Sequence, residues 1–280
     1  MSTKDFTANV ISATKVVPDG NFKDSKASGI WDINEALDLI KGGNWPNVAN
    51  VNPDAFVDAL FQTHLWTGNG TSDRTITNNI DLSGKGGLVW TKERNDTDKH
   101  LLIDTERGAT KYLQSVNSNG EDTSSESLKV FNSNGFTIGN LADINGNNDT
   151  FVSWTFRKQP KFFDIQTYTG NGSARTISHN LGSVPGMIIL KNLSSSGEGW
   201  RVYHRGANGG TNPEQYYAML QATNAFAAAS TPWNNTAPTS TEFTLGTDTG
   251  SNGNGNSFVA YLFAHNNDDG GFGEPGDQDI

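Results

Sequence analysis

The chain has 280 residues, no cysteine, a formal net charge of −10 and an isoelectric point of about 4.9. This length allows about two domains. The absence of cysteine excludes a disulfide framework and a thiolate metal site. The acidic balance argues against a nucleic-acid partner, because such binding relies on Lys and Arg contacts to phosphate. No stretch approaches the roughly 20 apolar residues of a membrane span, so we expect no membrane insertion.

The first sixty or so residues differ from the rest of the chain. Ile33, Leu37 and Ile40 lie on one face of a predicted helix that ends at a glycine pair. A second short helix is predicted from Pro53 or Asp54 through Phe61. The apolar content is too small for an independent core. We therefore expect residues 1–63 to be an anchoring segment that packs on a neighbouring protein or on a symmetry-related copy of the chain.

The remainder of the chain contains a duplication of domain size. Five phrases occur twice in the same order: Trp66–Gly70 and Tyr168–Gly172, Arg74–Ile76 and Arg175–Ile177, Gly87–Lys92 and Gly186–Lys191, Gly135–Gly139 and Glu242–Gly246, and Phe151–Phe156 and Phe258–Phe263. A repeat of this length predicts tandem modules, which favour display and binding over a single catalytic pocket.

Short alternating apolar runs and many glycines predict a mainly β protein with few helices. Asn-Gly pairs such as Asn134-Gly135 supply the positive φ angles of tight turns. We expect two tandem antiparallel β-sandwiches, at residues 64–163 and 164–270. Residues 271–280 then form a linker to a possible further repeat, and the natural chain is expected to continue or to be a truncated multi-repeat protein.

One acidic loop has oxygen-bearing side chains at alternate positions, the arrangement that lets a loop wrap a calcium ion. Its candidate ligands are Asp143, Asn145, Asn147 and Asp149. The loop lacks the glycine and the bidentate glutamate of a helix–loop–helix calcium site. A metal-free turn is therefore favoured, with calcium as the alternative and no other cofactor expected.

Four residues of the second repeat are candidates for sugar recognition, in which aromatic rings stack and amides bind hydroxyl groups. They are Trp200, Tyr203, Trp233 and Asn234. The favoured interpretation is that the two tryptophans fill the sandwich core instead.

Catalytic patterns are missing from the sequence. The five histidines are dispersed, and there is no H-E-x-x-H, G-x-S-x-G or Walker A motif. The carboxylates that we considered for glycoside hydrolysis, Asp104, Glu106, Asp164 and Glu242, show no pairing in the sequence. We expect no enzymatic activity and no catalytic residues.

Several phrases resemble the repeated β-modules of tail and fibre-like virion proteins of marine, cyanophage-type tailed bacteriophages. They are Ser178–Pro185 with Gly186–Ile189, Trp200–Gly206, Trp233–Thr236, Phe258–Tyr261, Asp104–Leu113, Ser28–Glu35 and Gly43–Pro46. The resemblance covers nearly all of the chain. It implies a virion protein assembled in the host cytoplasm, a lectin-like sandwich and a homotrimer.

The leading hypothesis is a tail fibre or tail-associated appendage that projects from the particle and aids host attachment. Its expected partners are other tail or portal-proximal virion proteins through residues 1–63, further copies of itself, and a glycan or protein of the host surface. The alternatives are a carbohydrate-active tailspike-type enzyme and a capsid or neck decoration protein that binds no receptor.

Overall fold

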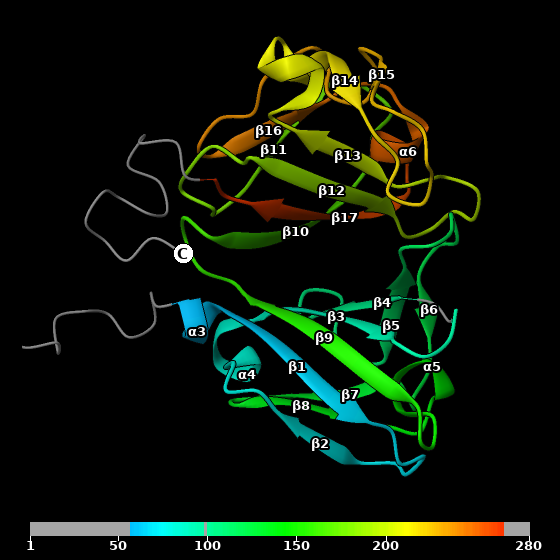
Figure 1. Cartoon of the computed structure of the whole chain (residues 1–280). Helices are drawn as coiled ribbons and strands as arrows, with labels where there is room; N and C mark the ends of the chain where they lie inside the picture. Colours follow the sequence, from blue (N-terminus) through cyan, green and yellow to red (C-terminus); the bar gives the residue numbers. More distant parts are fainter. Residues whose placement is uncertain (1–56, 98–99, 266–280) are drawn as a thin grey trace, which may run out of the picture. The chain divides into compact units, whose positions relative to one another are not determined.

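The computed structural model describes residues 57–97 and 100–265 (Figure 1). The chain divides into two compact units, Met1–Ala55 and Phe56–Ile280, and all described residues belong to the second. The helix predicted around Ile33, Leu37 and Ile40 and the linker at 271–280 lie outside the described residues, as does most of the anchoring segment.

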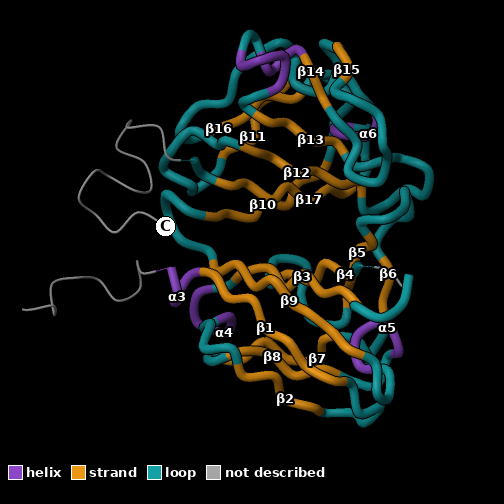
Figure 2. Tube along the Cα trace, in the orientation of Figure 1, coloured by secondary structure: helices purple, strands orange, loops and turns teal. Residues whose placement is uncertain are grey.

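The predicted fold class is confirmed, because the described chain is mainly antiparallel β-structure with only short helical turns (Figure 2). Among the described residues, no helix has the length and apolar character needed to cross a membrane.

The first sandwich packs a six-stranded sheet, in the order β1-β9-β3-β4-β5-β6, against a three-stranded sheet, β2-β8-β7. The strands are β1 (Phe61–Thr67), β2 (Arg74–Thr77), β3 (Gly87–Glu93), β4 (Leu101–Asp104), β5 (Lys111–Gln114), β6 (Asp122–Thr123), β7 (Leu128–Asn132), β8 (Gly135–Ile138) and β9 (Thr150–Arg157). Three single-turn helices accompany them, α3 (Val57–Leu60), α4 (Leu82–Lys85) and α5 (Ala142–Asn145).

The second sandwich packs a four-stranded sheet, β10-β17-β12-β13, against the pair β11-β16. Its strands are β10 (Phe163–Thr169), β11 (Arg175–Ser178), β12 (Met187–Asn192), β13 (Arg201–His204), β16 (Glu242–Leu245) and β17 (Ser257–Phe263). The connection after β13 carries η4 (Ala207–Gly210), η5 (Pro213–Gln215) and the small sheet β14 (Tyr216–Tyr217) with β15 (Ala227–Ala228), and α6 (Thr249–Asn252) precedes β17.

The two sandwiches share a strand order. The order β1-β9-β3-β4 of the first large sheet corresponds to β10-β17-β12-β13 of the second, and the pair β2-β8 corresponds to β11-β16. The five repeated phrases lie on these corresponding strands and on the turns that follow them. The sandwiches differ between the fourth strand and β8 or β16, where the first adds β5, β6 and β7 and the second has the η4–β15 excursion.

Three buried apolar clusters hold this unit together. One fills the first sandwich and includes Trp66 and Phe136, and a second fills the second sandwich around Trp233 and Phe243. The third joins residues of both large sheets: Leu88, Leu102, Leu113, Phe163, Ile165, Ile189, Trp200, Val202, Val259 and Tyr261. The outer faces of the two large sheets therefore pack on each other, and the repeats share a core.

Strand β17 shows why the sequence has an unbroken apolar run at this point. Phe258, Ala260 and Leu262 face the interior of the second sandwich, whereas Val259 and Tyr261 face the first sandwich. A strand that is buried on both faces needs apolar residues at consecutive positions rather than at alternate ones.

The start of the first sandwich corrects the sequence-based boundaries. Helix α3 ends at Leu60, and Phe61 already pairs with Phe156 in the large sheet. The helix predicted through Phe61 is therefore too long at its C-terminal end, and the strand starts before residue 64. The alternation of β1 from Phe61 to Thr67 carries this signal, because Trp66 is buried and its neighbours Leu65 and Thr67 are exposed.

Candidate functional site

The predicted calcium loop is a hydrogen-bonded clamp. Asn145, which is fully buried at the end of α5, donates from its amide nitrogen to the carbonyl oxygens of Thr71 at 2.8 Å and Gly139 at 3.0 Å. Its amide oxygen accepts from the backbone N–H of Asn69 at 3.2 Å and from the Arg74 guanidinium at 3.2 Å. One side chain thus fixes the Thr-Gly-Asn-Gly turn that follows β1.

The second repeat contains the same clamp. Asn252 donates to the carbonyls of Ser173 at 2.7 Å and Gly246 at 2.8 Å and accepts from the backbone N–H of Asn171 at 3.0 Å. Glycine is required in the clamped turn of each repeat, because a Cβ on Gly170 would lie 2.3 Å from the carbonyl oxygen of Gly253. The repeated sequence around these turns is explained by a repeated structural role.

This geometry argues against calcium at Asp143, Asn145, Asn147 and Asp149. The amide oxygen of Asn145 already faces a guanidinium, and Asp149 accepts a hydrogen bond from the Asn95 side chain at 3.0 Å. Residues 142–145 form a helical turn, which does not wrap its side chains around one point. Within the described ranges, no three His, Asp or Glu side chains gather as metal ligands would.

Three of the four candidate sugar-binding residues are buried, so the stacking hypothesis is wrong for them. Trp200 is 0%, Trp233 2% and Tyr203 4% exposed. Trp233 and Tyr203 pack edge to face in the core of the second sandwich, and the Trp200 indole donates to the Gln114 carbonyl of the first sandwich at 3.2 Å. Only Asn234 is exposed, and a sugar needs an open ring face beside it.

A buried polar network crosses between the repeats. The Tyr261 hydroxyl donates to the Asp104 carboxylate at 2.8 Å, and the Arg107 guanidinium binds the same carboxylate at 2.5 Å. Arg107 also donates to the Leu102 carbonyl at 2.7 Å. Burial raises the pKa of Tyr261 well above its ordinary value, so the hydroxyl stays protonated and donates. The network is structural, because its groups are sealed from solvent and bonded to each other.

Lys191 is a buried lysine at the same interface. Its ammonium group donates to the carbonyl oxygens of Asn192 and Glu198, both at 2.8 Å, and to Ser118 of the first repeat at 3.3 Å. Burial lowers the pKa of Lys191 to about 8. The corresponding Lys92 donates to the carbonyls of Glu93 and Asp96, so both repeats use this lysine to hold the loop after the strand.

Three of the four carboxylates considered for hydrolysis are engaged in other contacts. Asp104 belongs to the interface network, and Glu106 pairs with Lys158 at 2.5 Å. Asp164 is 3% exposed and accepts from the backbone N–H of Asn180 at 2.8 Å. Glu242 lies in β16, where its backbone pairs with that of Ser178 across the ladder. The side-chain contacts favour structural roles for the carboxylates of Asp104, Glu106 and Asp164.

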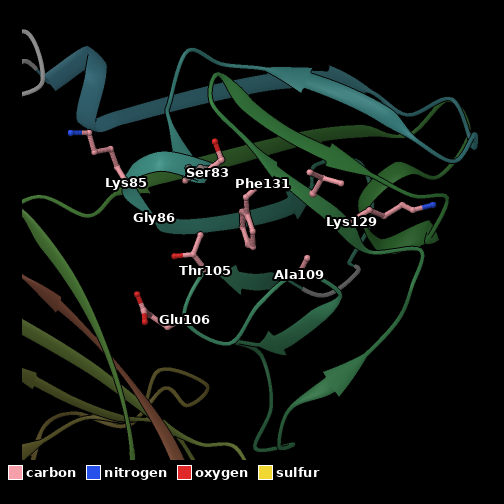
Figure 3. A pocket seen from close by; sticks show the side chains of 10 residues that line it. Ser83, Lys85, Gly86, Thr105, Glu106, Ala109, Lys129 and Phe131 are labelled. Atoms are coloured by element: carbon pink, nitrogen blue, oxygen red, sulfur yellow. The ribbon is translucent and has the colours of Figure 1, made fainter.

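A shallow cavity of about 590 Å³ opens on the first sandwich between α4, the turn after β4 and β7 (Figure 3). Phe131 lies in it, with Glu106 and Lys129 on different sides. Lys129 already pairs with Asp73 at 2.8 Å, and Glu106 pairs with Lys158. With these charges paired, the cavity presents little that would orient a substrate.

Sequence reasoning missed a half-exposed aromatic group, which we name the aromatic platform: Trp90, His100 and Trp154. Trp90 on β3 and Trp154 on β9 are direct cross-strand partners, and His100 directly precedes β4. The three ring centroids are 6.1 to 6.4 Å apart. The alignment of the two repeats could have indicated this group, because Trp90 corresponds to Ile189 of the second repeat.

Together, the fold and these sites define a mainly antiparallel β protein of two joined sandwiches, with an aromatic surface on the first. A family model described as a domain of unknown function, DUF7483, matches residues 58–274, which is more than half of the chain, and the chain therefore belongs to that family. No curated protein matches the chain.

Proposed function

We propose that the chain is a non-enzymatic structural protein of a tailed-bacteriophage particle, most simply a tail fibre or tail-associated appendage that projects from the virion and aids host attachment. The assignment to a phage particle rests on the sequence resemblance. The structure supports a display role through one observation above the others: two sandwiches with the same strand order share a buried cluster and pack into one unit.

One packed unit suits display because a shared core supports the surfaces of both repeats. The conspicuous buried polar groups also support a structural role. The side chains of Asn145 and Asn252 fix turns, the Asp104–Arg107–Tyr261 network fixes the interface, and Lys191 fixes a loop. We propose that residues 1–63 bind neighbouring virion proteins and that three copies assemble, which would multiply weak host contacts into avidity.

Location on the particle is the decisive test. Antibodies raised against the recombinant chain, followed by gold labelling and electron microscopy of purified particles, are expected to label the tail or an appendage. The matched control is the same serum depleted on immobilised recombinant chain. Label on the capsid or neck would support a decoration protein, and particles that carry no label would reject the proposal.

Attachment is tested separately by adsorption. The same antibodies, or an excess of recombinant chain, are expected to slow the binding of particles to host cells. Unchanged adsorption by tail-labelled particles would restrict the role to particle structure. Release of reducing sugar from host envelope by the purified chain at enzymatic rates would favour the tailspike-type enzyme instead.

A further inference from the structure

The two repeats cover their outer faces unequally. In the second repeat, the positions that correspond to Trp90, His100 and Trp154 are Ile189, Trp200 and Tyr261. These three side chains are 0% to 3% exposed and lie in the shared cluster. The three residues of the aromatic platform are only half-buried, although they occupy the same places on the same kind of sheet.

The aromatic platform is held in a fixed arrangement. Trp154 and His100 have nearly parallel rings, with an angle of 11° between their planes, and Trp90 stands edge-on to both. Trp90 and Trp154 project from neighbouring strands inside the large sheet, where the backbone is hydrogen-bonded on both sides. The rings are therefore preorganised, and ligand binding would cost little conformational entropy of these side chains.

The platform also offers a hydrogen-bond donor. The Trp90 indole N–H can only donate, and it lies 3.2 Å from Nδ1 of His100, so the neutral ring carries its proton on Nε2. That Nε2 group has no hydrogen-bond partner among residues 57–97 and 100–265. Burial is the main cause that lowers the pKa of His100, and the charge of the nearby Lys92 lowers it further. Both effects favour the neutral imidazole. Thr63, exposed and directly opposite Trp154 on β1, adds a hydroxyl at the rim.

The size of the platform limits what can bind there. A fully buried aromatic side chain covers about 150–250 Å², so three rings that are each largely covered leave only a minor part of that area open. A stable protein interface needs about 800 Å² on each partner. One or two sugar rings need far less, and a pyranose has an apolar C–H face for the indoles and hydroxyl groups for the imidazole and Thr63.

We propose that Trp90, His100, Trp154 and Thr63 form a binding site for a hexose-containing glycan. Trp154 offers an indole face for stacking on the sugar and the nearly perpendicular Trp90 contacts the edge of the same sugar, while Nε2 of His100 and the Thr63 hydroxyl bind its hydroxyl groups. This inference rests on the proposed function, for which it supplies the chemical class of the host receptor.

The test uses the full chain on a printed array of hexose-containing oligosaccharides and bacterial surface polysaccharides, and then calorimetric titration with the best-bound oligosaccharide. We expect Trp154→Ala and Trp90→Ala each to weaken binding by about tenfold or more. Trp154→Phe keeps an aromatic face and is expected to retain part of the affinity. The matched control is Phe226→Ala, which removes an exposed aromatic ring of the second repeat, 38% exposed, and should bind as the wild type does.

His100→Ala tests the same site without removing a large apolar side chain, and it should weaken binding while circular dichroism and the melting temperature stay near wild type. Absence of binding to every probe would overturn the proposal, as would wild-type affinity in a folded Trp154→Ala variant. If the chain self-associates and Trp154→Ala abolishes that self-association, the aromatic platform binds a second copy of the chain and the glycan proposal is wrong. Gold labelling of the particle is independent of these results. A particle without label would reject the proposed function, whereas a chain that binds no glycan would reject only this inference.

Discussion

The hydroxyl group of Tyr261 in the second repeat lies 2.8 Å from the carboxylate of Asp104 in the first, and both side chains are fully buried. This hydrogen bond ties the two repeats together at the centre of their shared cluster. It is charge-assisted, and charge-assisted hydrogen bonds are stronger than neutral ones.

Removal of that hydroxyl should weaken the whole unit. Tyr261→Phe keeps the ring and leaves Asp104 without one donor, so we expect the free energy of unfolding to fall by about 1–3 kcal/mol. Urea denaturation followed by circular dichroism measures it. The control Tyr217→Phe removes the hydroxyl of a half-buried tyrosine for which no hydrogen bond occurs among the described residues, and it should change stability by less than about 0.5 kcal/mol. Equal effects of the two changes would contradict the assigned role of the Tyr261 hydroxyl.

The asparagine clamps predict a sharp contrast between neighbouring positions. Asn252→Ala leaves buried backbone groups of the turn without partners and should cost about 2 kcal/mol or more. Asn254→Ala, two residues later and exposed, should cost less than about 0.5 kcal/mol. Thermal unfolding of both variants beside the wild type checks this difference, and a mild effect of Asn252→Ala would show that the turn holds its shape by other means.

Calcium should leave stability unchanged. A site that binds with a dissociation constant one hundredth of the free calcium concentration would add about 2.7 kcal/mol to the folded state. We expect the same melting temperature in millimolar calcium and in chelator, because Asn145 is occupied by Arg74 and backbone groups. A clear rise in melting temperature with calcium would restore the loop as a metal site.

Lys191 predicts how stability depends on pH in the alkaline range. Its pKa is about 8 in the folded protein and about 10.4 in an unfolded chain. Between these values the unfolded state binds more protons, so this residue makes stability rise with pH. Below about pH 8 both states are protonated and the full cost of the buried charge remains. The free energy of unfolding of wild type minus that of Lys191→Met should therefore grow from pH 8 to pH 10, and a constant difference would contradict the lowered pKa.

The shared cluster predicts cooperative unfolding. Separation of the sandwiches would expose Trp200, Tyr261 and the apolar residues around them, so neither repeat should unfold alone. Scanning calorimetry should show one transition whose calorimetric and van't Hoff enthalpies agree. Two resolved transitions would mean that each sandwich is stable without the other.

The sequence was most informative where local patterns determine the structure. Alternating strands and Asn-Gly turns correctly predicted an antiparallel β fold. The start of β1 was misplaced because the helical turn Val57–Leu60 continues directly into the strand without a glycine or proline between them.

The sites were harder to predict because burial depends on contacts far apart in the chain. Trp200 and Trp154 are both tryptophans in strand-rich segments, yet the first is covered by the other repeat and the second is half-exposed. Asn145 carries an amide oxygen of the kind that binds calcium. Only its contacts with residues some 70 positions earlier show that this amide is already engaged.

The face-to-face joint between the repeats sets how such a protein can grow. The outer face of the second repeat is largely covered, with Thr167 and Thr169 of β10 exposed beyond the shared cluster, and the first repeat keeps the margin that holds the aromatic platform. A further module of the same kind would not find the same joint free, since most of both outer faces is already buried in it. Extension of the chain would then proceed by pairs of joined sandwiches that are linked through sheet edges or loops. Each added pair would bring one new aromatic platform rather than two.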